Sequence, residues 1–136
     1  MKLNPQIQLS FNGQCEAAFR SYEQHLHGSI TFMLTWGDSP MKAGAPPGFD
    51  AKILHATITI GNAVITGADV AGYEQPTGFS IELKMDDTAG AERVFLALAE
   101  SGTIVTPIQE TFWAARFGMV VDRFGIPWAI NCERAV

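Results

Sequence analysis

Hydrophobic and polar residues alternate along the first regular segment of the chain, residues 7–11, where every second side chain is apolar. This period of two predicts a strand with one buried face. Residues 12–28 then change to helical spacing, with Asn12 as the expected N-cap and Gly28 as the expected C-terminal stop. The buried stripe expected for this helix consists of Cys15, Phe19, Tyr22 and Leu26.

The next segments contain a strand, a long loop and a hairpin. Residues 29–34 predict a strand, and residues 53–69 predict a hairpin that turns at Gly61-Asn62. Between them, residues 36–52 are rich in proline and glycine, which forbids a regular element. A loop of this length is often a lid or a contact surface, and it can equally be a surface segment without a role.

The second half of the chain repeats the order of the first. Strands are predicted at residues 79–85 and 103–108, a helix at 86–102, and a hairpin at 113–132 that turns at Gly125. The second helix has Asp87 or Thr88 as its cap and a stop at Gly102, and its apolar face consists of Ala91, Val94, Phe95 and Leu98. We therefore expect one α+β domain, residues 1–136, built from two βαβββ modules, residues 1–72 and 73–136.

Composition narrows the class of protein. The chain has 136 residues, 47% hydrophobic and 17% charged, which is typical of a folded domain. Its net charge of −5 and the lack of a basic stripe argue against nucleic acid and anionic membranes as partners. Neither a membrane-spanning run nor a signal-peptide pattern is present, so free thiols at Cys15 and Cys132 and a cytoplasmic location are expected.

Arg116 is the first candidate for a binding residue. It shares a predicted strand face with small neighbours such as Gly118, which leave space beside it. Two interpretations stay open. Arg116 forms a structural ion pair with Asp122 or Glu110, or it clamps a carboxylate or phosphate of a ligand, because a guanidinium suits planar oxyanions.

Other candidates are polar or aromatic residues on the predicted strands. Gln8, Glu82 and Asn131 alternate with apolar residues, so they face water on an open sheet or become specificity groups if the sheet curls around a pocket. His55 is either satisfied by a backbone carbonyl or in contact with a ligand. Trp113 is a core or dimer contact, or it lines a cleft. No catalytic residue can be assigned.

Three segments carry a resemblance to a known family: "FNGQCEAAFRSYEQHLHG", "HATITIGNAVITGAD" and "QETFWAARFGMVVDRFGIPWAINC". They resemble the PhnB-like family of the vicinal oxygen chelate superfamily, which includes glyoxalase I and the bleomycin-resistance proteins. The resemblance implies two βαβββ modules with curved mixed sheets that form a cleft, and a homodimer. It also implies that many members hold a divalent metal through His, Gln or Glu.

The metal positions implied by the resemblance are poorly filled in this sequence. The ligand on the first strand would be Gln6 or Gln8, and the ligand at the start of the second module would be Ser80. The position of the Glu on the last strand is Ala129, which has no donor atom. We therefore expect no firmly held cofactor, and we expect Ser80 to contact the ligand instead.

Two functions follow from the resemblance. The first is a protein that binds a small molecule in the cleft between the modules without a complete metal triad. The alternative is a metal-dependent lyase, isomerase or dioxygenase with altered ligands, Gln8, His55 and Glu82. A methyltransferase-like label is also attached to this family, but the sequence contains no GxGxxG motif after a strand to support it.

Overall fold

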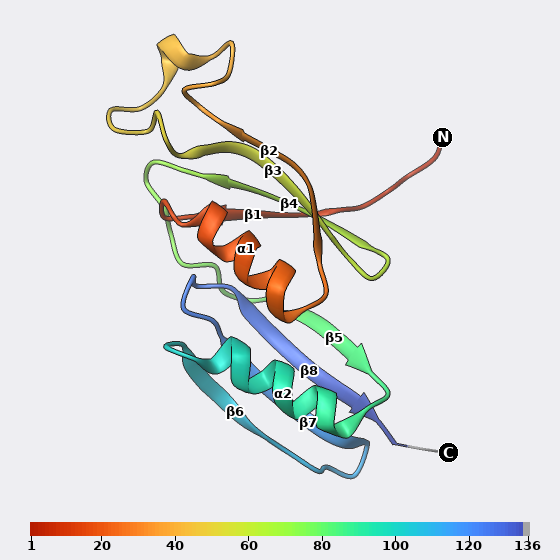
Figure 1. Ribbon diagram of the computed structural model, residues 1–136. Helices are drawn as coiled ribbons and strands as arrows, with labels where there is room; N and C mark the ends of the chain where they lie inside the picture. Colours follow the sequence, from red (N-terminus) through yellow and green to blue (C-terminus); the bar gives the residue numbers. More distant parts are fainter. Residues whose placement is uncertain (135–136) are drawn as a thin grey trace. The chain divides into compact units, whose positions relative to one another are not determined.

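The computed structural model describes residues 1–134, and the chain divides into two compact units, Met1–Tyr73 and Glu74 to the end. The first unit contains β1 (Ile7–Phe11), α1 (Cys15–His25), β2 (Ser29–Thr35), the short 3₁₀ helix η1 (Lys42–Gly44), β3 (Ile53–Ile60) and β4 (Ala63–Asp69). Its sheet has the order β1-β4-β3-β2 (Figure 1), with β1 parallel to β4 and the other pairs antiparallel.

The second unit repeats this arrangement. It contains β5 (Ile81–Met85), α2 (Thr88–Ala99), β6 (Thr103–Gln109), β7 (Ala114–Val121) and β8 (Pro127–Glu133). Its sheet has the order β5-β8-β7-β6, again with one parallel pair, β5 and β8. The prediction of an α+β fold with a doubled βαβββ unit is therefore confirmed.

Each helix covers one face of the sheet in its own unit (Figure 1). The helix stripes are buried as predicted, Cys15, Phe19, Tyr22 and Leu26 in α1 and Ala91, Val94, Phe95 and Leu98 in α2. In the first unit the ring of Phe19 meets that of Phe11 edge to face, with centroids 5.9 Å apart. Burying one such large apolar side chain stabilises the fold by about 1.5–3 kcal/mol, so these stripes fix which face of each sheet the helix covers.

Two buried carboxylates tie loops to these cores. Asp69, at the end of β4, accepts hydrogen bonds from the backbone N–H groups of Cys15 and Ile53, at 2.9 and 2.8 Å. Asp122, after β7, accepts from two backbone N–H groups of the following turn and from Trp128 Nε1, at 2.9–3.0 Å. Each carboxylate satisfies donors that would otherwise be buried without a partner.

Some predicted helix ends are wrong. The first helix begins at Cys15 with Gln14 as N-cap and no side-chain cap, so Asn12 has no such role. The residue with left-handed φ is not Gly28 or Gly102 but the one before each, His27 (φ 54°) and Ser101 (φ 57°). At Gly28 an added Cβ would lie 2.8 Å from Ile58 Cδ1, so this glycine is needed for close packing. Asp87 does cap α2.

The turns and the long loop agree with the sequence pattern. Gly61-Asn62 connects β3 to β4, and Gly125 takes a φ of 90° in the turn before β8. The loop 36–52 contains only the 3₁₀ turn, and its two ends are joined by hydrogen bonds from Trp36 N to Lys52 O (2.9 Å) and from Gly37 N to Asp50 O (2.8 Å). Neither helix in residues 1–134 is long and apolar enough to span a membrane.

Candidate functional site

The face of each sheet opposite its helix carries the polar residues singled out in the sequence. On the first sheet, one row of residues paired across all four strands runs Gln8–Thr66–Thr57–Phe32. This row and His55, two residues before Thr57 on β3, define the first open face. Gln8 and His55 are both exposed there, on strands separated by β4.

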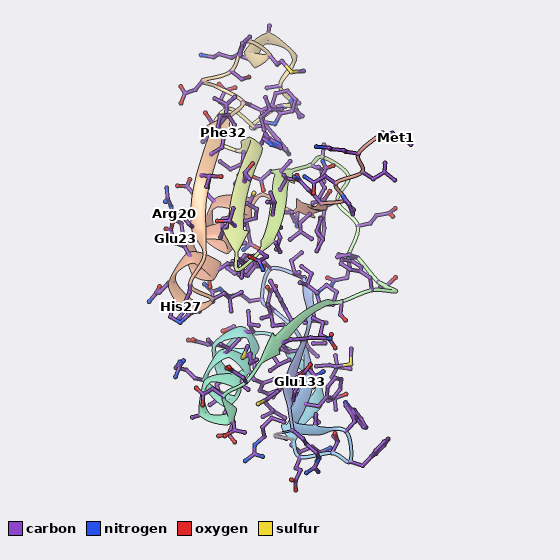
Figure 2. The ribbon with its side chains drawn as sticks, turned by 90° about the vertical axis from the view of Figure 1, so that its right-hand side faces the viewer. Met1, Arg20, Glu23, His27, Phe32 and Glu133 are labelled. Atoms are coloured by element: carbon purple, nitrogen blue, oxygen red, sulfur yellow. The ribbon has the colours of Figure 1, made fainter. Side chains whose placement is uncertain are left out.

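His55 is held by side chains of the first open face. Its Nε2 atom lies 3.5 Å from Thr57 Oγ1, and its ring centroid lies 5.9 Å from that of Phe32, which is labelled on β2 in Figure 2. The interpretation that a backbone carbonyl satisfies this histidine is therefore wrong, since its hydrogen-bonding contact is a hydroxyl. The other interpretation, contact with a ligand, stays a prediction.

The open face of the second sheet contains two paired rows, and together they define the second open face. The rows are Glu82–Ala129–Met119–Thr106 and Lys84–Asn131–Phe117–Gln109. Polar groups on β5 and β8 thus lie beside apolar side chains on β7. Ser80 immediately precedes β5 and is half-buried.

Asn131 has an unusual environment on the second open face. Its Oδ1 atom is buried and accepts no hydrogen bond from any residue in 1–134. A buried acceptor without a partner costs about 1–3 kcal/mol. Along the row, its neighbours are Lys84 on one side and Phe117 on the other. The arrangement leaves an acceptor that a hydrogen-bond donor of a ligand would satisfy.

An aromatic cluster of Phe112, Trp113 and Phe117 borders this face at the start of β7. The Trp113 centroid lies 4.8 Å from that of Phe112 and 5.4 Å from that of Phe117, with the rings in edge contact. Trp113 is 50% exposed and Phe112 is 89% exposed, so the interpretation of Trp113 as a core residue is wrong. The backbone beside it is held by Thr111, whose Oγ1 accepts from Ala114 N at 3.0 Å.

A pocket of about 370 Å³ lies at the carboxyl ends of β5 and β8, lined by Lys84, Met85, Asp86 and Glu133. Figure 2 labels Glu133 on β8. Lys84 belongs to the second open face, and the pocket therefore adjoins it. None of its charged side chains forms an ion pair with a residue in 1–134.

Arg116 lies on the other face of the second sheet, the one that α2 covers. Its Nε atom donates to Glu92 of α2 at 2.8 Å, so the predicted partners, Asp122 and Glu110, are wrong. The hydrogen bond and charge of Glu92 raise the pKa of Arg116 above its usual value. The space expected beside Gly118 is also filled, because an added Cβ would lie 2.8 Å from the Phe95 ring. The anion-clamp role therefore loses the open surroundings that motivated it.

The strand positions implied as metal ligands carry few donor atoms within either unit. No three His, Cys, Asp or Glu residues in 1–134 converge on a point. Gln8 is paired with Thr66, and Glu82 is paired with Ala129, which has no donor atom. Each row thus supplies one oxygen ligand, the neutral amide of Gln8 or the carboxylate of Glu82. The incomplete metal triad remains a prediction that metal binding must test.

The cysteines are parts of the two cores. Burial, followed by the charges of Asp69 and Glu16, raises the pKa of the Cys15 thiol well above its usual range. Cys132 is also buried. Because the thiolate is the nucleophilic form, a thiol held protonated in this way is unreactive, and Cys15 has a structural role.

The fold and these open faces define a class of protein. A solved fosfomycin resistance protein, FosX from Mesorhizobium loti, has the same fold with a TM-score of 0.63 at 12% identity, over 98% of this chain and 94% of that one. This likeness shows that the chain has the fold expected from its resemblance to the vicinal oxygen chelate superfamily.

The family is shown by sequence. A family model described as "3-demethylubiquinone-9 3-methyltransferase" matches residues 4–131. The chain belongs to this family, the PhnB-like proteins.

Three similar proteins match over nearly their whole lengths. Protein YjdN of Escherichia coli (strain K12) is 35% identical over 141 residues, which cover 96% of this chain and 95% of that protein. The crystal structure of PA1353 from Pseudomonas aeruginosa is 44% identical with a TM-score of 0.89, over 98% and 100% of the two chains. The Bacillus cereus structure described as a putative 3-demethylubiquinone-9 3-methyltransferase, PhnB protein, is 21% identical with a TM-score of 0.83, over 96% and 100%.

The sequence interpretation missed the residues that extend the second open face. Lys84, Asp86 and Glu133 were not chosen as candidates, although Lys84 and Asp86 continue the alternation that begins at Glu82. Phe117, which is paired with Asn131, also lies on this face. The pairing of β5 with β8 brings these residues together, and the sequence pattern alone does not give that register.

Proposed function

We propose that the protein binds a small organic molecule on the second open face, without a resident metal ion. The observation that carries this proposal is the buried, unpartnered Oδ1 of Asn131 in one row with Lys84 and Phe117. Binding sites for small molecules combine apolar walls with a few polar groups that fix orientation. Ala129, Met119 and Phe117 supply the apolar surface here, and Asn131 and Lys84 supply polar groups.

The proposal gives different roles to the remaining candidate residues. Glu82 is paired with Ala129 in the neighbouring row, and Ser80 precedes Glu82 at the start of β5. Trp113 forms an aromatic wall through its contact with Phe117. We assign Arg116 no contact with the ligand, because Glu92 occupies its guanidinium.

The first open face contributes Gln8 and His55 as a separate polar surface. The contact of His55 with Phe32 and Thr57 gives it one apolar and one polar neighbour, an environment that suits contact with a ligand. We do not base the proposal on the methyltransferase in the family's description. The strand–helix junctions Phe11–Cys15 and Met85–Thr88 contain no glycine-rich nucleotide motif.

A fragment screen by protein-observed NMR, run with a chelator present, tests the proposal. We expect hits whose amide shift changes concentrate on β5, β7 and β8 around Lys84, Phe117 and Asn131. Adding manganese, zinc or nickel after the chelator is removed should leave their affinities unchanged. Hits that map elsewhere would contradict the assignment of the site. Affinity that appears only with a metal would instead favour a metal-dependent enzyme.

The homodimer implied by the resemblance belongs to the proposal as well. The edge strand β6 exposes Ile104 and Val105, at 51% and 59%, and the loop before β7 exposes Phe112 at 89%. Exposed apolar surface of this kind marks contact sites. Light scattering after size exclusion should give a mass near twice 14.8 kDa, and replacing Val105 by lysine should lower it. A single-chain mass for the unaltered protein would contradict the dimer.

A further inference from the structure

The pocket beside the second open face holds opposite charges that do not neutralise each other. Lys84 and Asp86 both line it, with Glu133, yet none forms an ion pair with another residue in 1–134. Lys84 lies in β5, and Asp86 follows the end of that strand. The pocket therefore presents a cation and carboxylates as separate groups, which suits a ligand carrying charges at both ends.

The two carboxylates of the pocket come from the ends of adjacent parallel strands. Met85, the last residue of β5, is paired with Cys132 of β8, Asp86 follows β5, and Glu133 is the last residue of β8. Both carboxylates line the same pocket, and like charges that share a site disfavour each other. A cationic group between these two carboxylates would relieve that repulsion.

Asn131 adds an independent feature that also calls for a donor. It lies two residues before Glu133 on β8, beside Lys84, and its buried Oδ1 has no partner among residues 1–134. Together with the carboxylates of Asp86 and Glu133, it gives three acceptor groups. A protonated primary amine carries three N–H donors and matches them in number.

We propose that the ligand is a zwitterion. Its ammonium group binds the acceptors of Asp86, Glu133 and Asn131, its anionic group binds Lys84, and its apolar body lies against the neighbouring aromatic cluster. The proposal rests on the proposed function and deepens it, because it names the class of ligand for the same site. It also replaces the expectation of an anionic ligand that Arg116 had motivated.

Three small molecules of similar shape and different charge test which charged groups of a ligand the pocket recognises. They are 4-(aminomethyl)benzoate, which is a zwitterion, 4-methylbenzoate, which is an anion, and 4-methylbenzylamine, which is a cation. Dissociation constants would be measured by NMR titration at low salt, because screening weakens exposed charges. We expect the zwitterion to bind about tenfold more tightly than either analogue, a ratio in the range of one charge-assisted hydrogen bond.

Single substitutions test which residues bind the ammonium end of the ligand and which bind its anionic end. We expect Asp86→Asn and Glu133→Gln each to weaken binding of the zwitterion about three- to tenfold, and Lys84→Met to reduce its advantage over the cation. Glu100→Gln and Lys42→Met alter exposed charges that do not line the pocket and should leave affinity unchanged.

Equal affinities for the three probes, or no saturable binding of any, would overturn the zwitterion assignment. So would unchanged affinity in Asp86→Asn and Glu133→Gln. The outcome for the proposed function is distinguishable from the outcome for the zwitterion assignment. If neutral or anionic fragments bind the second open face and depend on Asn131, that function stands while the zwitterion assignment falls.

Discussion

Replacing Asn131 by leucine should stabilise the protein and weaken ligand binding tenfold or more. The buried Oδ1 of Asn131 has no partner among residues 1–134, and an unmet acceptor of this kind costs about 1–3 kcal/mol. Leucine has nearly the same shape without the polar atom. Asparagine is also disfavoured in strands relative to aliphatic residues. Because Asn131 is only partly buried, we expect the lower part of that range, a gain of about 1–2 kcal/mol.

Urea unfolding, followed by tryptophan fluorescence and circular dichroism, measures the change. With a slope of about 1.5 kcal/mol per molar urea, the midpoint should rise by roughly 1 M. Gln109→Leu is the matched control, because Gln109 is an exposed amide in the same row of the second open face and has no buried unpaired atom. Its free energy of unfolding should change by less than about 0.5 kcal/mol.

The reasoning is refuted if Asn131→Leu lowers the free energy of unfolding while Gln109→Leu does not. That result would mean that Asn131 makes a stabilising hydrogen bond. If Asn131→Leu is more stable and still binds the fragment, the unpaired acceptor costs stability without contributing to binding. The unpaired acceptor would then be a defect of packing, and not a feature kept for a ligand.

Three further predictions concern the second core and the buried thiol. Asp122→Ala should lower the free energy of unfolding by about 3–5 kcal/mol, because Trp128 Nε1 and two backbone N–H groups lose their acceptor. Gly102→Ala should cost about 1–3 kcal/mol, since the new Cβ meets backbone atoms at the end of β7, whereas Gly44→Ala has open space. The raised pKa of Cys15 means that stability is complete below the unfolded pKa and falls above about pH 8.5 by roughly 1.4 kcal/mol per unit.

Urea midpoints check all three, with pH 8, 9 and 10 for the thiol. Cys15→Ala is expected to lose part of the alkaline decline, and the difference between the two proteins isolates this group from others that titrate there. If the Asp122→Ala protein unfolds at the same urea concentration as the unaltered protein, the Asp122 carboxylate does not stabilise the fold as an acceptor. A Gly102→Ala protein as stable as Gly44→Ala would show that β7 moves to accept the methyl group.

The sequence pattern predicted the order of the elements because local periodicity and turn chemistry decide them. Alternation located β1 and β7, and the helical spacing of the α1 and α2 stripes identified both helices with their buried faces. Helix ends were less predictable. A glycine after a helix normally indicates a left-handed residue, yet here His27 adopts that conformation and Gly28 is needed for contact with Ile58.

The candidate site was only partly predictable, because pairing between strands decides which residues meet. Alternation identified Glu82 and Asn131 as polar positions, but the neighbours of Asn131 depend on the register of β8 with β5 and β7. Arg116 shows the same limit. The strand face of Arg116, shared with Gly118, was predicted correctly. Only the placement of α2 shows that Glu92 forms an ion pair with its guanidinium group.

The most direct test of the central claim is the dissociation constant of the strongest fragment hit, measured by calorimetry with a chelator present. Asn131→Leu and Gln109→Leu would be compared with the unaltered protein. If a metal-free second open face binds the ligand, Asn131→Leu should weaken binding tenfold or more while Gln109→Leu leaves it unchanged. Equal affinity in all three proteins, or binding that vanishes with the chelator, would contradict the account.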